Sequence, residues 1–387
     1  MILRQLKPAA SWGSLRGKLA LCRGRQGGSP PARADLLRLA LLASIVGLAA
    51  AASVRGATHP AGFDETSLEE RMLHDAADGC LDGFSPLEAA LIAGGVNEEA
   101  ELATLVRSLR SPIDASNRGD ASSWSKARAL HQWMHATILT GAYNDDAADV
   151  RATLEGGEFN CLTATILYNE FCRRQGVEAR AISVPGHVFS RVLGDVDADI
   201  EAGDAETSDV FDVQTTCPDW FERSPLTESA RQRGRGLDEI QLIAKLYYNR
   251  GVRQHRLGQF AGAVASLRTA ASLDAQDAAA RENLSAAINN WALAECEAGR
   301  YRRAAELLSE GARADARFAP FVENDVYVAG RWAESLCGQR DFAQALQVLE
   351  AAQSRHPDIV VLDRALKSVR AAQERFRRPR KSAFGDR

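Results

Sequence analysis

The sequence is poor in the features that define several common classes of protein. Its 387 residues include seven cysteines, and no two of them form a Cys-x-x-Cys pair, which argues against a zinc ribbon. Positive and negative side chains nearly balance, at 47 Lys and Arg against 51 Asp and Glu, so the composition offers no overall basic surface to nucleic acid. The hydrophobic share of 45% excludes wholesale disorder, a collagen-like chain and a protein with many membrane spans. At roughly 150 residues per domain, the length predicts two domains.

The first 57 residues differ from the rest in charge and hydropathy. Eight Lys and Arg and one acid precede Leu39, and sixteen uncharged residues follow, from Leu39 to Val54. A basic stretch, an apolar run and small residues at its end are typical of an export signal. The run is short for a spanning helix, which needs about 20 apolar residues, so an uncleaved signal-anchor and a buried core helix are the alternatives. We expect residues 1–57 to form a signal peptide or a signal-anchor, the latter attached to the membrane through residues 39–54.

Residues 63–222 combine a helical first half with a strand-rich second half. Ser85, Pro86 and Glu88 form the pattern of a capping box with proline at the first helical position. Hydrophobic periodicity predicts further helices over 123–139 and 161–175, the second ended by Gly176. Alternating hydrophobicity then predicts strands over 177–184, 188–193 and 210–216.

An acidic segment, residues 194–209, separates the second and third predicted strands and holds seven carboxylates. A solvated hairpin loop is one interpretation. A calcium loop is the other, with Asp195, Asp197, Asp199 and Glu206 at ligand positions, although Ile200 stands where the turn-forming glycine belongs.

The last third of the chain is predicted to be helical and repetitive. Residues 223–238 are polar and contain glycine, which indicates a linker. From 239 to 372 the pattern recurs every 41 residues, and residues 373–387 form a basic tail, interpreted as solvated. Trp291 and Trp332, which also match at this spacing, are interpreted as side chains that pack between helices. The positions that match are Phe260/Tyr301/Phe342, Ala263/Ala304/Ala345, Leu267/Leu308/Leu349, Gly251/Ala292/Ala333, Trp291/Trp332 and Cys296/Cys337.

Three side chains suggest a nucleophilic site. Cys161 stands in the first turn of a predicted helix, where free N–H groups and the helix dipole favour a thiolate. His187 opens a strand after Pro185-Gly186 and could serve as the base, and Asp212 on the next strand could orient that base. Each also has an ordinary structural interpretation: a cysteine at a helix start, a turn histidine and a capping acid. A metal site made of the same three residues is a further alternative.

The order of these motifs resembles the transglutaminase-like superfamily, which shares its core with papain-type proteases. The resemblance is closest to a bacterial branch in which an Asn-Cys-Leu-Ser helix, a Leu-Tyr, an Arg-x-Gly, a Pro-Gly-His strand and an Asp/Asn-Ile-Glu-Thr-Thr-like strand precede tetratricopeptide repeats. The repeats here resemble that type, whose usual period is 34. The matching segments are Asn160-Cys161-Leu162-Thr163, Leu167-Tyr168, Arg174-Gln175-Gly176, Pro185-Gly186-His187-Val188-Phe189 and Asp212-Val213-Gln214-Thr215-Thr216.

The resemblance implies an α+β papain/transglutaminase-like core followed by an all-α tetratricopeptide-type array, with Cys161, His187 and Asp212 as a catalytic triad. The expected activity is that of a thiol-dependent amide hydrolase or acyltransferase, exported or membrane-anchored in a bacterial periplasm or cell envelope. No cofactor, metal or nucleic acid is expected. A protein or peptide is the expected substrate, and a partner protein is expected on the repeats. Asn160 and Gln132 are candidates for a second oxyanion donor. The alternative is a non-catalytic interaction scaffold. The presence of all three residues, Cys, His and Asp, favours the enzyme over this alternative.

Overall fold

Capping side chains set the ends of the helices. The computed structural model describes residues 67–109, 122–194, 210–218 and 234–377. Ser67 and Ser85 each close a capping box with a glutamate three residues later, which confirms the expected box at Ser85. Gly176 follows the central helix with φ 69°, as expected of its C-terminal cap. The helices of this first part are α1 (Leu68–Asp75), the short η2 (Ala76–Asp78), α2 (Pro86–Ala93), α3 (Glu99–Ser108), α5 (Ser123–Thr137), α6 (Val150–Leu154) and α7 (Cys161–Arg174).

Some expectations concern residues outside the described ranges. These are the signal peptide or signal-anchor at 1–57, the calcium loop at 195–206, most of the linker at 223–238 and the end of the basic tail at 378–387. Among the residues that the structure does describe, no helix has the length and apolar character needed to cross a membrane.

A four-stranded antiparallel sheet follows α7, in the order β3-β2-β1-β4. Two of its strands begin or end within one residue of the expected bounds, because the Pro185-Gly186 turn, with Gly186 at φ 77°, fixes their hairpin. The edge strand β4 is a correction to the sequence interpretation, since it falls within the expected linker and pairs with β1. The strands are β1 (Glu178–Val184), β2 (His187–Leu193), β3 (Val210–Val213) and β4 (Arg235–Leu237).

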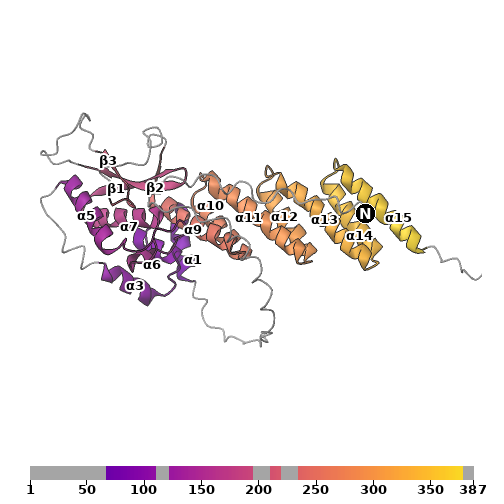
Figure 1. Cartoon of the computed structure of the whole chain (residues 1–387), viewed down its shortest axis with the longest axis horizontal. Helices are drawn as coiled ribbons and strands as arrows, with labels where there is room; N and C mark the ends of the chain where they lie inside the picture. The colour runs from indigo at the N-terminus through magenta and orange to yellow at the C-terminus, as the bar shows by residue number, and fades with distance from the viewer. Residues whose placement is uncertain (1–66, 110–121, 195–209, 219–233, 378–387) are drawn as a thin grey trace, which may run out of the picture.

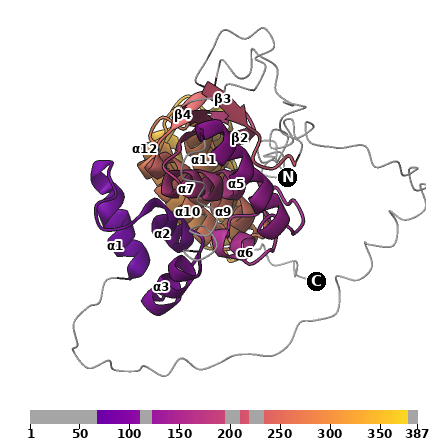
Figure 2. The ribbon, with the colours of Figure 1, turned by 90° about the vertical axis from the view of Figure 1, so that its left-hand side faces the viewer.

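Helix α7 forms the centre of the first part, and ten of its fourteen residues are buried. The sheet lies over α7 and α5, and α3 lies on the side of α7 away from the sheet (Figures 1 and 2). Tyr168 and Phe171 of α7 have no exposed surface and pack in the main apolar cluster with residues of α2, α5 and β2. This packing holds the first residue of α7, Cys161, at a defined place against the start of β2.

The remainder of the described chain is a row of helices that extends away from the sheet (Figure 1). The expected 41-residue repeat corresponds to helix pairs, and the alanines and leucines at matched positions are buried throughout. The turns within successive pairs also match, with positive φ at Gly258 (72°), Gly299 (76°) and Arg340 (65°). The helices are α9 (Glu239–Arg256), α10 (Phe260–Leu273), α11 (Ala278–Glu297), α12 (Tyr301–Ala314), α13 (Pro320–Gly338), α14 (Phe342–Arg355) and α15 (Val360–Arg377).

The first helix pair of the array is joined to the first part by a common core. Leu242, Leu246 and Tyr247 of α9 belong to the same apolar cluster as the buried face of α7. The Tyr247 hydroxyl donates to Glu69 at 2.8 Å, and Arg250 forms an ion pair with the same carboxylate at 2.9 Å. The described residues therefore form a mostly helical fold with a small antiparallel sheet, continued by a helical, repetitive C-terminal part.

Candidate active site

Asn160 fixes the start of α7 and thereby the position of Cys161. Its backbone is extended, at φ −139° and ψ −174°, and its side-chain oxygen accepts the N–H groups of Leu162 and Thr163, both at 3.0 Å. Its amide nitrogen donates to two carbonyl oxygens, that of Ala147 at 2.7 Å and that of Asp145 at 3.2 Å. Because these bonds occupy the whole amide, Asn160 acts as a helix cap and has no free donor for an oxyanion.

The other candidate oxyanion donor, Gln132, has an exposed side chain on α5. Hydrogen bonds to the sulfur of Cys161 come instead from two backbone N–H groups, that of Val188 and its own, and from the hydroxyl of Tyr143. Val188 directly follows His187, so the sulfur lies beside the first residues of β2.

The structure gives Cys161 a different electrostatic setting from the one expected at a helix N-terminus. Burial raises the pKa of its thiol above the ordinary value, and the carboxylate of Asp145 acts in the same direction. The hydrogen bonds from Val188 and Tyr143 oppose this rise without cancelling it. Two N–H groups of the first turn are also occupied by the Asn160 cap. The expected lowering of the Cys161 pKa is therefore not met, and the resting group is the thiol.

His187 meets a buried amide. Its Nε2 lies 2.8 Å from Oε1 of Gln214, a residue that is only 2% exposed. Since an amide oxygen accepts, this contact assigns the proton to Nε2 and leaves Nδ1 of the imidazole able to take another. Burial lowers the pKa of His187, and the bond to Gln214 opposes that lowering. The imidazole is therefore neutral at rest, as a general base must be.

The expected hydrogen bond between His187 and Asp212 is not formed, which corrects the predicted triad. Asp212 lies opposite Arg191 in the β2–β3 register, and the guanidinium binds both carboxylate oxygens, at 2.7 and 3.1 Å. Arg191 is four residues beyond His187, roughly 13 Å along the strand. Gln214, two residues after Asp212, emerges on the same face and nearer to the histidine. The signal that could have pointed to Gln214 is alternation along the strand, which puts it on the same face as Asp212.

A layer of side chains from the helices holds Gln214 in place. His131 of α5, which is 1% exposed, lies with Nε2 at 3.3 Å from the carbonyl oxygen of Gln214. The hydroxyls of Thr165 on α7 and Thr215 are 2.9 Å apart. Burial, with the nearby ring of His135, lowers the pKa of His131 to about 4, so this histidine is a neutral structural partner. Nothing in the sequence pattern distinguished His131 from other helix residues.

These contacts place a thiol, a neutral imidazole and an amide acceptor around the start of β2. Among the described residues, no hydrogen bond joins the Cys161 and His187 side chains, so proton transfer between them requires a side-chain rearrangement or the arrival of a substrate. No cluster of three or more His, Cys, Asp or Glu in the described ranges is arranged to hold a metal ion. The alternative metal site of Cys161, His187 and Asp212 is thus not assembled.

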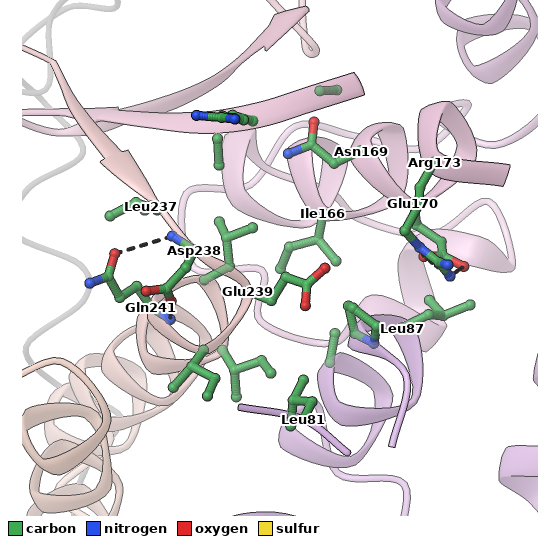
Figure 3. A pocket seen from close by; sticks show the side chains of 18 of the residues that line it. Leu81, Leu87, Ile166, Asn169, Glu170, Arg173, Leu237, Asp238, Glu239 and Gln241 are labelled. Carbon is green, nitrogen blue, oxygen red and sulfur yellow. Dashed lines mark hydrogen bonds and ion pairs between the residues drawn. The ribbon is translucent and has the colours of Figure 1, made fainter. Parts of the chain in front are cut away.

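A separate cavity of about 940 Å³ lies at the other end of α7, between α2, the β1–β4 edge and α9. Its floor and walls are largely apolar, including Leu87 and Ile166, and the carboxylate of Glu239 points into it (Figure 3). Burial raises the pKa of Glu239, which the positive charge of Arg173 opposes. Cys161, His187 and Gln214 do not line this cavity, so it is distinct from the candidate active site.

Known proteins give no further guide to the site. No model of a known protein family, no curated protein and no solved structure matches this chain.

Proposed function

We propose that the chain is a thiol-dependent amide hydrolase or acyltransferase, built on a papain/transglutaminase-like core that a tetratricopeptide-type array extends. Cys161 is the nucleophile, His187 the base and Gln214 the group that orients the base. The observation that carries this proposal is the 2.8 Å contact of His187 with the buried Gln214 amide, on a strand that starts beside the sulfur of Cys161. An amide oxygen can orient the histidine by accepting its N–H, as it does in Cys-His-Asn sites.

The proposed reaction begins with a neutral pair. Nδ1 of His187 takes the proton of the Cys161 thiol, and the sulfur attacks the carbonyl carbon of an amide. In this proposal the backbone N–H groups of Cys161 and Val188, which hydrogen-bond to the sulfur at rest, bind the negative oxygen that forms once the sulfur is bonded to the carbonyl carbon. The imidazolium then gives its proton to the leaving amine, and a thioester on Cys161 remains. Water resolves the thioester to an acid, and an amine resolves it to a new amide.

The proposal also covers the cellular location of the protein and its binding partners. The basic and apolar composition of residues 1–57 supports export or membrane anchoring, through residues 39–54 in the second case. An exported enzyme of this kind acts on proteins or peptides of the cell envelope. The helical array supplies an extended surface for a partner protein, as stacked helical repeats do in general.

A non-catalytic scaffold is the second candidate function. It is favoured by the raised pKa of the Cys161 thiol and by the lack of a hydrogen bond between the described side chains of Cys161 and His187. In that case the first domain serves as a folded platform, and partner binding by the array is the whole function.

Trapping of the acyl-enzyme separates the two candidates. The chain is incubated with cell-envelope extract, quenched in acid, and the peptide containing Cys161 is searched by mass spectrometry for an adduct that hydroxylamine removes. We expect the adduct on the wild type, and at a level on the order of 100-fold lower when Gln214→Leu removes the orienting oxygen. Gln214→Glu, which keeps an acceptor, and Asp212→Asn should both retain it.

The Cys161→Ala variant is the blank for this measurement. Absence of any hydroxylamine-sensitive adduct, together with equal partner recovery by the wild type and Cys161→Ala, would establish the scaffold instead. Loss of the adduct in Asp212→Asn but not in Gln214→Leu would return the orienting role to Asp212.

A further inference from the structure

Two tryptophans of the array occupy equivalent small pockets in successive repeats. Trp291 of α11 lines a pocket of about 210 Å³, and Trp332 of α13 lines one of about 260 Å³. The two pockets are built from the same repeat positions, since six lining residues of the first have their partners 41 residues later in the second. These pairs are Val264/Ala305, Ile288/Ala329, Trp291/Trp332, Arg303/Gln344, Leu307/Val348 and Glu310/Ala351.

A third pocket, of about 380 Å³, connects them across the start of α12. It shares Arg303 with the first pocket and Trp332 with the second, so the three pockets adjoin one another along a line from α10 over α12 to α14. We call this row of three pockets the Trp groove.

The tryptophans pack against the cores of the repeats, as expected, and they also line the two pockets. The repeat positions that serve only packing are fully enclosed, as Ala263, Ala304 and Ala345 are with no exposed surface. Trp291 and Trp332 are half-buried instead, and the guanidinium of Arg303 lies 5.0 Å from the centre of the Trp291 ring. A half-buried indole with a cation over it is a surface suited to an incoming apolar side chain and a negative charge.

Five arginines and three acids line the Trp groove, so positive side chains outnumber negative ones there. Four of these arginines are already in ion pairs: Arg268 with Glu310, Arg303 with Glu306, Arg355 with Asp325, and Arg300 with Glu295, an acid outside the lining. Arg302 is exposed and has no ion-pair partner among the described residues. The first turn of α12 carries no acid, so the helix dipole adds to the positive potential there. The lining arginines are Arg268, Arg300, Arg302, Arg303 and Arg355, against Glu306, Glu310 and Asp325.

We propose that the Trp groove binds an extended, acidic segment of a partner protein that inserts one apolar side chain into each tryptophan pocket. Packed helices lie about 8–10 Å apart, and α11 and α13, which carry the two tryptophans, are corresponding helices of successive repeats. Successive pockets are therefore separated by about three residues of extended chain, at roughly 3.3 Å for each residue. The segment therefore carries two apolar residues about three positions apart, with glutamates or aspartates between and around them. This deepens the partner-binding part of the proposed function and is independent of the chemistry at Cys161.

Fluorescence anisotropy tests the proposal on the full chain carrying Cys161→Ala, so that no covalent step contributes. The probe is a fluorescein-labelled peptide of about twelve residues, rich in glutamate, with two phenylalanines three positions apart. The comparison peptide has lysine in place of every glutamate, and unlabelled oligothymidine is added as a competitor. We expect the acidic peptide to bind at least about tenfold more tightly than the lysine peptide.

Two variants locate the binding. Arg302→Glu should weaken binding of the acidic peptide about fivefold or more, and Trp332→Ala about tenfold. Arg317→Glu, an exposed arginine that does not line the groove, is the matched control and should remain within about twofold of the parent. Because Trp332→Ala could also loosen the helix pair, Arg302→Glu decides the outcome by itself.

Equal binding of the two peptides, or unchanged binding by Arg302→Glu, would overturn the proposal. Oligothymidine that competes more strongly than the acidic peptide would overturn it in favour of a nucleic-acid surface. Neither result would bear on acylation of Cys161, so the two proposals fail separately.

Discussion

Lowering the pH should reduce the folding stability of the candidate active site through His131, beginning at pH values above those at which carboxylates are protonated. The buried imidazole has its pKa lowered from 6.5 to about 4, so the folded site holds fewer protons than the unfolded chain between these two values. Stability that is present above pH 6.5 is therefore lost as the pH falls toward 4. At about 1.4 kcal/mol for each unit of pKa, this single group accounts for about 3 kcal/mol.

The perturbation is His131→Gln, which keeps an N–H donor for the carbonyl oxygen of Gln214 but cannot be charged. Between pH 6.5 and 4 the variant should lose about 3 kcal/mol less than the wild type. Burial also lowers the pKa values of His187 and His255, but these contribute equally to both chains and cancel in the comparison. His74→Gln, at an exposed histidine, is the matched control.

Hydrogen exchange is the suitable assay because a chain with several folding units has no single free energy of unfolding. Peptides that cover α5 and β3 report on the site, and peptides that cover α14 serve as an internal reference. Exchange rates are converted to protection relative to the intrinsic rate at each pH. If protection in α5 and β3 falls equally in the wild type and in His131→Gln as the pH is lowered, His131 is not the buried neutral group described above.

Further changes test the thiol, the orienting amide and one turn of the array. Because burial raises the pKa of Cys161 above 9.0, its alkylation by iodoacetamide should still accelerate beyond that pH, and a plateau near pH 6 would contradict the burial argument. Gln214→Leu should lower the pKa of His187 further, since the amide bond opposes the effect of burial, whereas Asp212→Asn should leave it unchanged; NMR titration of the imidazole distinguishes the two. Arg340→Gly should stabilise the last repeats by about 0.5–1 kcal/mol in urea unfolding, because Arg340 adopts φ 65°. A destabilised variant would mean that its cation–π contact with a phenylalanine at 5.1 Å outweighs the backbone strain.

Local interactions made much of the fold predictable. The Ser85 capping box and the Pro185-Gly186 turn depend on neighbours in the chain, so their sequence signals are sufficient. The 41-residue repeat was equally visible, because each helix pair must bury the same positions against the next. The three residues of β4 gave no such signal, since a strand this short, with Gly236 at its centre, forms only because β1 offers a free edge.

The parts of the site that depend on local sequence features were predictable, and the parts that depend on tertiary packing were not. Cys161 and His187 were found because a helix start and a strand start are local features. Alternation places Asp212 of β3 and Gln214, just beyond its end, on one face. The choice between them depends on the register with β2, which the sequence does not determine because a long acidic insert separates the two strands. The protonation of Cys161 likewise depends on what covers it, and Tyr143 and Val188 come from distant segments.

The core that α9 shares with α7 determines how much of the array the first domain needs in order to fold. A protease cut just before Glu239 would remove Leu242, Leu246 and Tyr247 from that core, at a cost on the order of 2–5 kcal/mol for each large side chain, and should leave the remaining fragment unfolded. Loss of α13 to α15 removes only helices whose apolar contacts are with one another and with the preceding repeat. We therefore expect the first domain to fold without the last repeats, α13 to α15, and not to fold without α9.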